Sequence, residues 1–400
     1  MEKVVIIGGG YAGIYALREL VKNKNIKITL IDKHTYHNLQ PEVYDLIANK
    51  SSFADVTIDL TTLCKGFDHD HLDFKNLKVR KIDQKAKKIY TEEQETVEFD
   101  YLIVAAGTRT FFPPSIPGLN NADDIKKLHR AITFKQSFEK QLFEKVRDEF
   151  KECEDTHIVV VGAGLSGVEI AAEMAHYANK FFKRGKFSCD NLKISLISSS
   201  SSILPGLKQD LINISQKRLR DLGINVITGI KLQEVGDGYC KFSNGTKIQH
   251  SFVVFTGGVE ASTILSEIND IEKNAKGQVI VNEYMQTTAY ENIFAVGDIA
   301  EIRNKKGEIM PPNVTIARIS GANAGTNVLR LIAKKPLIKC DPKLDGILIA
   351  LGGSYAAGDI YGLLTVKGRL AYEIKKYVFM SYRRPLLRLL KKGYAKLKKI

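Results

Sequence analysis

Two glycine-rich segments share one spacing and one sequence context. Each has the pattern GxGxxG, with an apolar run before it and a run of helical character after it. The glycines are Gly8, Gly10 and Gly13 in the first copy and Gly162, Gly164 and Gly167 in the second. Glycine lets the backbone turn tightly and approach a pyrophosphate, while free N–H groups at the start of a helix attract phosphate. The repeat therefore predicts two dinucleotide-binding turns.

The residue that ends the next apolar run differs between the two copies. Residues 28–31 are followed by Asp32, where a carboxylate can accept a hydrogen bond from a ribose hydroxyl. Residues 194–197 run instead into five serines, Ser198 to Ser202. Serine lacks the carboxylate that favours a 2′-hydroxyl and repels a 2′-phosphate, so the choice between NADH and NADPH stays open. The alternative is a serine-rich loop with no nucleotide role.

Three more apolar runs end in glycine. Their ends are Ala106-Gly107, Gly257-Gly258 and Gly297-Asp298. Buried strands explain the apolar stretches. They do not explain the glycine that recurs at each end.

The length and composition set the frame for these motifs. The chain has 400 residues, which suits two or three domains. Hydrophobic residues make up 44% and charged residues 26%, close to the average of globular proteins, so a disordered chain and a multi-span membrane protein are both excluded.

Cysteines and targeting signals exclude further classes. The five cysteines lie far apart without a CxxC pair, which argues against a disulfide scaffold or a structural zinc site. The apolar run before Gly8 is too short for a signal peptide, and no stretch approaches about 18 apolar residues. We expect a peripheral protein at the cytoplasmic face of the cell membrane, with no transmembrane helix and no signal peptide.

The positive charge is concentrated at the C-terminus. Residues 367–400 contribute +11 of the net +14. Their apolar residues recur at helical spacing between basic ones, which predicts a basic amphipathic helix that binds an anionic membrane surface through residues 376–400. Pro385 and Gly393 argue against one uninterrupted helix, and a solvated tail or a helix packed on its own domain are the alternatives. Charge confined to one terminus argues against nucleic-acid binding.

Taken in order, these motifs resemble the two-dinucleotide-domain flavoprotein superfamily. The resemblance implies that the first turn binds FAD, through Gly8, Gly10, Gly13, Asp32 and Asp298. It implies that the second turn binds NADH or NADPH, through Gly162, Gly164 and Gly167. Further cofactor contacts are expected from Tyr11, Ala12, Lys33, Ala106, Gly107, Gly258, Gly297 and Ala317.

Three segments resemble a narrower family, the single-subunit, non-proton-pumping type II NADH:quinone dehydrogenases. The segments are residues 32–44, 164–173 and 368–375. The resemblance implies hydride transfer from NAD(P)H to FAD and electron transfer to a membrane quinone. It implies catalytic roles for Glu169 and Lys375, whose alternatives are an acid in the first turn of a helix and a surface lysine. It also implies a homodimer, because family members tend to dimerise through C-terminal elements.

The predicted fold class is α/β, with two Rossmann-like dinucleotide-binding domains plus a C-terminal membrane-associating region. We expect residues 1–120 and 275–330 to form a discontinuous FAD-binding domain. Residues 121–274 form the expected NAD(P)H-binding domain, and residues 331–400 the membrane-binding region.

One motif departs from the family pattern. The quinone-lining Ala-Gln-x-Ala-x-Gln motif aligns with residues 314–319, where Thr315 and Ile319 replace the two glutamines. The quinone site is therefore expected at Ala317 with altered chemistry. A sulfide:quinone oxidoreductase is the alternative function. It would need a cysteine pair at the flavin, and Cys153, Cys189 and Cys340 are the available residues.

Overall fold

A parallel sheet forms the first half of the molecule. The computed structural model describes residues 1–147, 156–185 and 192–398. The sheet has the order β20-β9-β1-β2-β5. Its strands are β1 (Glu2–Ile7), β2 (Ile26–Asp32), β5 (Leu72–Asn76), β9 (Tyr101–Val104) and β20 (Ile293–Ala295). The last strand comes from late in the chain, so the sequence leaves this sheet and returns to it.

A second parallel sheet repeats the arrangement. Its order is β13-β12-β11-β17. The strands are β11 (Thr156–Val161), β12 (Leu192–Ile197), β13 (Asn225–Ile227) and β17 (Phe252–Phe255). The central strands of both sheets are buried and rich in Val and Ile, as expected for parallel strands covered on both faces.

Strand register shows which residues of the two sheets are equivalent. In the first sheet Ile7 of β1 pairs with Ile31 of β2, and in the second Val161 of β11 pairs with Ile197 of β12. The following glycine N–H then donates to the Ile31 or Ile197 carbonyl oxygen, at 2.8 and 2.9 Å. The next residues, Asp32 and Ser198, therefore occupy corresponding positions.

Helices cover the sheets. They are α1 (Tyr11–Leu20), α2 (Val43–Ile47), α3 (Leu60–Gly66), α4 (Leu128–Arg147), α5 (Leu165–Gly185), α6 (Gln209–Asp221), α7 (Val314–Ile332) and α8 (Gly368–Leu397). Local capping sets some of their starts. The Asp59 side chain accepts a hydrogen bond from the Thr62 N–H at α3, and Asn313 accepts one from Ile316 at α7.

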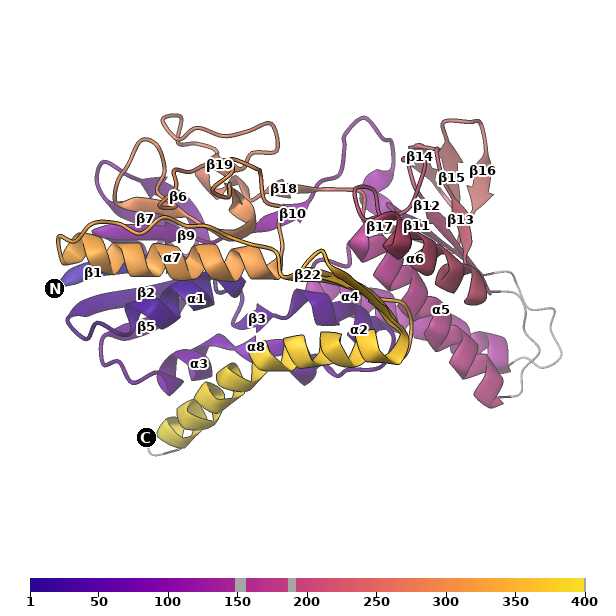
Figure 1. The fold of residues 1–400 in the computed structure, drawn as a ribbon, viewed down its shortest axis with the longest axis horizontal. Helices are drawn as coiled ribbons and strands as arrows, with labels where there is room; N and C mark the ends of the chain where they lie inside the picture. The colour runs from indigo at the N-terminus through magenta and orange to yellow at the C-terminus, as the bar shows by residue number, and fades with distance from the viewer. Residues whose placement is uncertain (148–155, 186–191, 399–400) are drawn as a thin grey trace.

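Small antiparallel sheets join the parts. They are β3 (Tyr36–Asn38) with β4 (Thr57–Asp59), β6 (Val79–Asp83) with β7 (Lys88–Thr91) and β8 (Thr96–Glu98), β10 (Thr108–Thr110) with β18 (Val259–Ala261), and β14 (Leu232–Gly236) with β15 (Tyr239–Phe242) and β16 (Lys247–Gln249). A short parallel pair joins β19 (Val279–Ile280) to β21 (Ala300–Glu301). The β10–β18 pair lies between the two large sheets in Figure 1, where the chain crosses from one half to the other and back.

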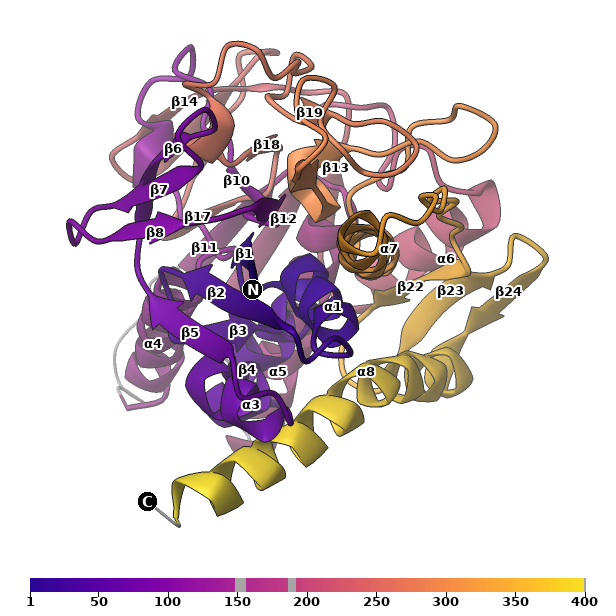
Figure 2. The same cartoon turned by 90° about the vertical axis from the view of Figure 1, so that its left-hand side faces the viewer.

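Helices α1 and α7 pack with their backbones in close contact, side by side in Figure 2. A Cβ atom at Gly321 would lie 2.1 Å from the Ala12 carbonyl oxygen, and one at Gly325 would lie 2.6 Å from that of Ala16. Only glycine permits this approach. It brings α7 against the helix that follows the first glycine turn.

The C-terminal part contains a sheet as well as a helix. The three-stranded antiparallel sheet comprises β22 (Gly346–Ala350), β23 (Ala356–Ile360) and β24 (Leu364–Lys367). Membrane-binding helices were expected here from the sequence, but these strands were not. Helix α8 starts directly after β24 and crosses the lower part of the molecule to α3 (Figures 1 and 2).

Helix α8 runs without interruption from Gly368 to Leu397, although Pro385 and Gly393 argued against one uninterrupted helix. At Gly393 the reason is tertiary packing. A Cβ at Gly393 would lie 2.0 Å from the Thr62 carbonyl oxygen of α3, and one at Gly66 would lie 2.0 Å from that of Leu389. Gly393 therefore allows close helix–helix contact rather than ending the helix. Helix packing on the protein's own domain, an alternative from the sequence, is observed for this face.

Candidate active site

The first glycine turn is shaped by backbone contacts. Gly8 has φ +110°, and a Cβ there would lie 2.4 Å from the Ala105 carbonyl oxygen. A Cβ at Gly13 would lie 1.8 Å from the Gly8 carbonyl oxygen. At Gly10, by contrast, a Cβ would meet nothing within 4 Å, and α1 begins there without a side-chain cap. The first N–H groups of α1, at Tyr11 and Ala12, therefore face room for a phosphate.

Asp32 closes one side of this turn. Its carboxylate accepts hydrogen bonds from the backbone N–H of Gly9 at 2.6 Å and of His34 at 2.8 Å. Burial raises the pKa of the carboxyl, although the two hydrogen bonds oppose this. The neighbouring Lys33 is exposed. The carboxylate is thus held at the strand end, with lone pairs left for a ribose hydroxyl.

The Gly297-Asp298 strand end meets the turn from another side. Gly297 has φ +70°, and a Cβ there would lie 3.0 Å from the Ala12 Cβ and 3.5 Å from the Ala317 Cβ. Burial raises the pKa of Asp298, and the nearby Lys126 cation opposes this. The structure therefore gathers these residues around the start of α1.

Ala106 and Gly107 follow β9 at the same end of the sheet as the Gly8 turn and Gly297. Gly107 has φ +64° and a Cβ there would meet nothing within 4 Å. Its carbonyl oxygen accepts a hydrogen bond from the Ser262 N–H at 3.0 Å. These strand ends combine tight backbone geometry with open space, which fits a bound flavin dinucleotide.

The second turn has nearly the same geometry. Gly162 has φ +107°, and a Cβ at Gly167 would lie 1.7 Å from the Gly162 carbonyl oxygen. That carbonyl also accepts a hydrogen bond from the Thr256 hydroxyl at 2.8 Å. Cβ atoms at Gly164 and Gly258 would meet nothing within 4 Å. The residues thus fit a second dinucleotide.

Ser198 uses its hydroxyl within its own loop. Its Oγ donates to the Ser202 carbonyl oxygen at 2.8 Å and accepts from the Ser200 N–H at 3.2 Å. The side chain is buried. The second strand end therefore presents a folded serine loop where the first presents a carboxylate.

The two catalytic candidates are in direct contact. Glu169, in the first turns of α5, accepts a hydrogen bond from the Ala350 N–H at 2.8 Å and forms an ion pair with Lys375 of α8. The Lys375 side chain is only 19% exposed, so it is not a surface lysine. Burial lowers its pKa, but Glu169, Glu42 and Asp45 together outweigh burial and raise it. Lys375 therefore stays protonated at neutral pH.

A second buried charge cluster, which sequence analysis missed, lies beside this pair. Glu173, one helical turn after Glu169, accepts hydrogen bonds from Lys50 Nζ at 2.9 Å and from the Gly353 N–H at 3.2 Å. Lys50 also pairs with Asp45 at 2.7 Å. The spacing of the two glutamates along one helix face was the available signal.

A cavity of about 20 Å³ lies between the two groups, with room for about one water molecule. It is lined by Pro41, Glu42, Tyr44, Asp45, Lys50, Ala350, Tyr372, Lys375 and Lys376. The charged groups come from the N-terminal segment and from α8. The cavity thus joins parts of the sequence that are more than 300 residues apart.

The two quinone candidates lie one turn apart on α7. Thr315 and Ile319 are half-buried, and Ile319 packs against the apolar core. Between them Arg318 lies over the Tyr15 ring at 4.8 Å and the Tyr382 ring at 5.8 Å. The charged and aromatic groups beside Thr315 and Ile319 are therefore Arg318, Tyr15 and Tyr382, none of which was predicted as a site residue from the sequence.

The described cysteines are unsuited to thiolate chemistry. Cys64, Cys240 and Cys340 are buried and free. Burial raises the pKa of each thiol to about 12, which keeps it protonated. Cys153 and Cys189 lie outside the described residues. Within the described ranges no cluster of His, Cys, Asp or Glu could hold a metal ion.

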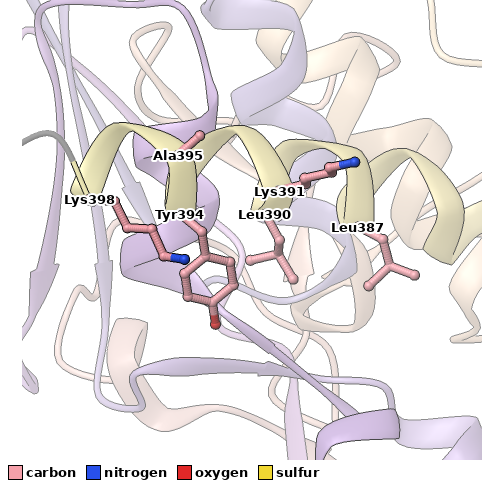
Figure 3. A pocket seen from close by; sticks show the side chains of 6 residues that line it. All are labelled: Leu387, Leu390, Lys391, Tyr394, Ala395 and Lys398. Carbon is pink, nitrogen blue, oxygen red and sulfur yellow. The ribbon is translucent and has the colours of Figure 1, made fainter.

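The outer face of α8 carries an apolar and basic stripe. Figure 3 shows Leu387, Leu390 and Tyr394 on one side of the helix, with Lys391 and Lys398 nearby. They line a shallow groove of about 460 Å³. Among the described helices, none has the length and apolar character to span a bilayer.

Comparisons with known proteins place this geometry in context. The model of the pyridine nucleotide-disulphide oxidoreductase family matches residues 2–322. The type II NADH:quinone oxidoreductase of Haemophilus influenzae is 26% identical, over 93% of this chain and 91% of the relative. The enzyme of that name from Staphylococcus aureus is also 26% identical, over 94% of each chain.

Two solved structures share the fold. NDH2 from Plasmodium falciparum in complex with NADH has a TM-score of 0.85 at 19% identity, covering 100% of this chain and 98% of that one. The sulfide:quinone oxidoreductase from Aquifex aeolicus has a TM-score of 0.79 at 21% identity, covering 98% and 92%. The predicted α/β fold is confirmed.

Proposed function

Because the chain belongs to the pyridine nucleotide-disulphide oxidoreductase family, we propose that it is an FAD-dependent NAD(P)H:quinone oxidoreductase. It passes a hydride from NAD(P)H to FAD and two electrons on to a membrane quinone. The observation that carries this is the pair of dinucleotide turns in one chain, together with the buried Glu169–Lys375 pair that joins α5 to α8. Relatives named type II NADH:quinone oxidoreductase match nearly the whole length.

The cofactor contacts follow from the two turns. Bound FAD supplies a two-electron carrier that accepts hydride and passes electrons on. FAD is held by Gly8, Gly10, Tyr11, Ala12, Gly13, Asp32, Lys33, Ala106, Gly107, Gly297, Asp298 and Ala317. NAD(P)H is held by Gly162, Gly164, Gly167 and Gly258. On this proposal residues 1–120 and 275–330 form the FAD domain, 121–274 the NAD(P)H domain and 331–400 the membrane-binding region.

Glu169 and Lys375 act as one unit. Glu169 orients the nicotinamide and tunes proton delivery, while Lys375 places an ammonium group near the group being reduced. Because Lys375 is buried, Glu169→Gln leaves an ammonium without its carboxylate, and turnover should fall at least tenfold. Stopped-flow measurement of flavin reduction and of quinone turnover tests this. Unchanged rates in both would contradict the role.

The quinone binds beside α7, with Thr315 and Ile319 in its wall. Neither side chain offers the amide group of the family's glutamines. The apolar ring and tail of the quinone therefore contribute more to its affinity than hydrogen bonds to its carbonyl oxygens do. Ile319→Gln should therefore change quinone KM more than NADH KM. Equal effects on both would place Ile319 outside the quinone site.

The protein binds the anionic surface of the membrane through residues 376–400 as a peripheral protein. The exposed stripe on α8 combines Leu387 and Tyr394 with Lys391 and Lys398, as an interfacial helix does. The variant Lys391→Glu with Lys398→Glu should lose cosedimentation with vesicles of phosphatidylcholine and phosphatidylglycerol. Lys85→Glu with Lys87→Glu, two exposed lysines outside α8, is the matched control and should bind as the wild type does. Retained binding by the α8 variant would reject the anchor.

Homodimerisation through C-terminal elements completes the proposal. Sedimentation velocity in detergent should give twice the mass of one chain. A single monomeric species at micromolar concentration would reject it.

The deciding experiment is an anaerobic titration of the purified flavoprotein with NADH, NADPH and sulfide in separate cells. Bleaching of the flavin by a pyridine nucleotide and its recovery with a soluble quinone support the proposal and identify the donor. The likeness to a sulfide:quinone oxidoreductase gives the second candidate function. Bleaching by sulfide alone would move the assignment there.

A further inference from the structure

Quinone reduction by NADH takes up one proton from solvent, if the proposed function holds. NADH gives a hydride, which is two electrons and one hydrogen nucleus. A quinol contains two electrons and two protons more than the quinone. One proton per turnover must therefore enter the protein, and the Glu169–Lys375 pair is too buried to meet solvent freely.

Glu42 stands where such a proton would enter. It ends the short 3-10 helix Gln40–Glu42, directly before α2, and is half-buried. Its side chain lines the small cavity together with Lys375 and the exposed Lys376. Within the described residues its carboxyl group makes no hydrogen bond or ion pair, unlike Asp45 and Glu173, which Lys50 holds.

Charges on every side act on this carboxyl. Burial raises its pKa most, and Asp45 and Glu169 raise it further, while Lys375 and Lys50 lower it, to a net value of about 7. Tyr11 on α1 interacts electrostatically with Glu42, and Tyr44 lines the same cavity. Burial raises the pKa of both tyrosines, so they stay neutral. Near neutral pH both the protonated and the deprotonated form of Glu42 are therefore populated.

We propose that Glu42 is the proton-entry residue, which passes the solvent proton of each turnover to the Lys375–Glu169 pair. An N–H bond of Lys375 breaks as its proton goes to the quinone oxygen that has gained the electron pair. The O–H bond of Glu42 then breaks and restores the ammonium of Lys375. Solvent reprotonates the Glu42 carboxylate. The transfer from Glu42 to Lys375 is downhill, because the amine binds a proton more tightly than the carboxylate does.

Half-reactions of the holoenzyme test this. In the wild type, reoxidation of the reduced flavin by a short-tailed quinone should slow as pH rises through about 7. We call this fall in rate near pH 7 the break in the pH profile. Glu42→Gln should lower the reoxidation rate at least tenfold at pH 6 and remove the break, while flavin reduction by NADH changes less than twofold. Glu42→Asp should restore the break. Asp45→Asn, the same charge change in the same cavity wall, should keep the break but move it to lower pH, because it removes a charge that raises the pKa of Glu42.

A second readout does not depend on turnover. In the resting enzyme, the infrared band of a protonated carboxyl group should lose intensity as pH rises through about 7, and Glu42→Gln should remove that change. The same titration in both proteins would overturn the proposal.

The outcomes separate this inference from the proposed function. A wild type that quinone reoxidises with a pH profile unchanged by Glu42→Gln overturns the inference alone. A wild type that quinone does not reoxidise at any pH overturns the proposed function and the inference with it.

Discussion

The two glycine turns are alike where phosphate would sit and different where ribose would sit. Gly8 and Gly162 have φ of +110° and +107°, and each is approached by the last glycine of its motif. The two turns differ at the residue after Ile31 and Ile197. Asp32 accepts hydrogen bonds from two backbone N–H groups, whereas Ser198 donates its hydroxyl hydrogen bond within a serine loop. The backbone geometry is common to dinucleotides in general, whereas the strand end selects among them.

The largest expected effect comes from breaking each turn separately. Gly13→Ala places a methyl group 1.8 Å from a backbone oxygen, and the flavin content per chain should fall more than tenfold. Gly167→Ala makes the equivalent clash at 1.7 Å, yet should keep its flavin and raise the KM for NADH more than tenfold. The ratio of flavin to protein absorbance measures the first effect, and steady-state kinetics the second. Loss of flavin in both variants would mean that the turns do not act independently.

A smaller effect follows from making the strand ends alike. Ser198→Asp restores a carboxylate at the position equivalent to Asp32, so kcat/KM for NADPH should fall about tenfold relative to NADH through repulsion of the 2′-phosphate. Ser201→Asp, at an exposed position in the same loop, is the control and should shift the ratio less than about threefold. An unchanged ratio in Ser198→Asp would show that this loop does not contact the ribose.

The smallest effect is a difference in pH dependence between the two sites. Burial raises the pKa of Asp32 above that of a free aspartate, so its carboxylate is protonated earlier as pH falls. A protonated Asp32 accepts hydrogen bonds more weakly, so FAD affinity should decrease a few-fold as pH falls. NADH affinity should change less, because Ser198 stands where a ribose-binding carboxylate would be. Fluorescence of released flavin measures the first, and anaerobic NADH titration the second. Asp32→Asn should make FAD release independent of pH where Asp32 titrates. A pH profile like that of the wild type would contradict the assignment of Asp32 to the FAD site.

The local motifs were predictable because each is contained in a short segment. The strand, glycine turn and helix around Gly8, the acid at Asp32 and the strand before Asp298 all depend on neighbours in sequence. The glycine spacing and the apolar runs of such a unit can be recognised within one short segment, even though its final geometry also depends on distant backbone such as Ala105 beside Gly8. The α/β fold could be predicted from them.

The features that were missed depend on distant contacts. Gly393 resembles a helix breaker, and only the backbone of α3 beside it shows why glycine is needed there. The spacing of Glu169 and Glu173 along one helix face hinted at a second buried acid, but the partners Lys50 and Asp45 come from a distant part of the chain and could not be inferred from it. The short strands of 346–367 gave no recognised alternation in the sequence.

The length of α8 between its two fixed contacts is constrained. Lys375 meets Glu169, and eighteen positions later Gly393 meets α3. Eighteen residues are five complete turns of an α-helix, so both contacts lie on one side of a rod about 27 Å long. Inserting or deleting a single residue between them would rotate one contact by about 100° away from its partner. Point substitutions on the outer face of this segment are tolerable, but a change in its length is not.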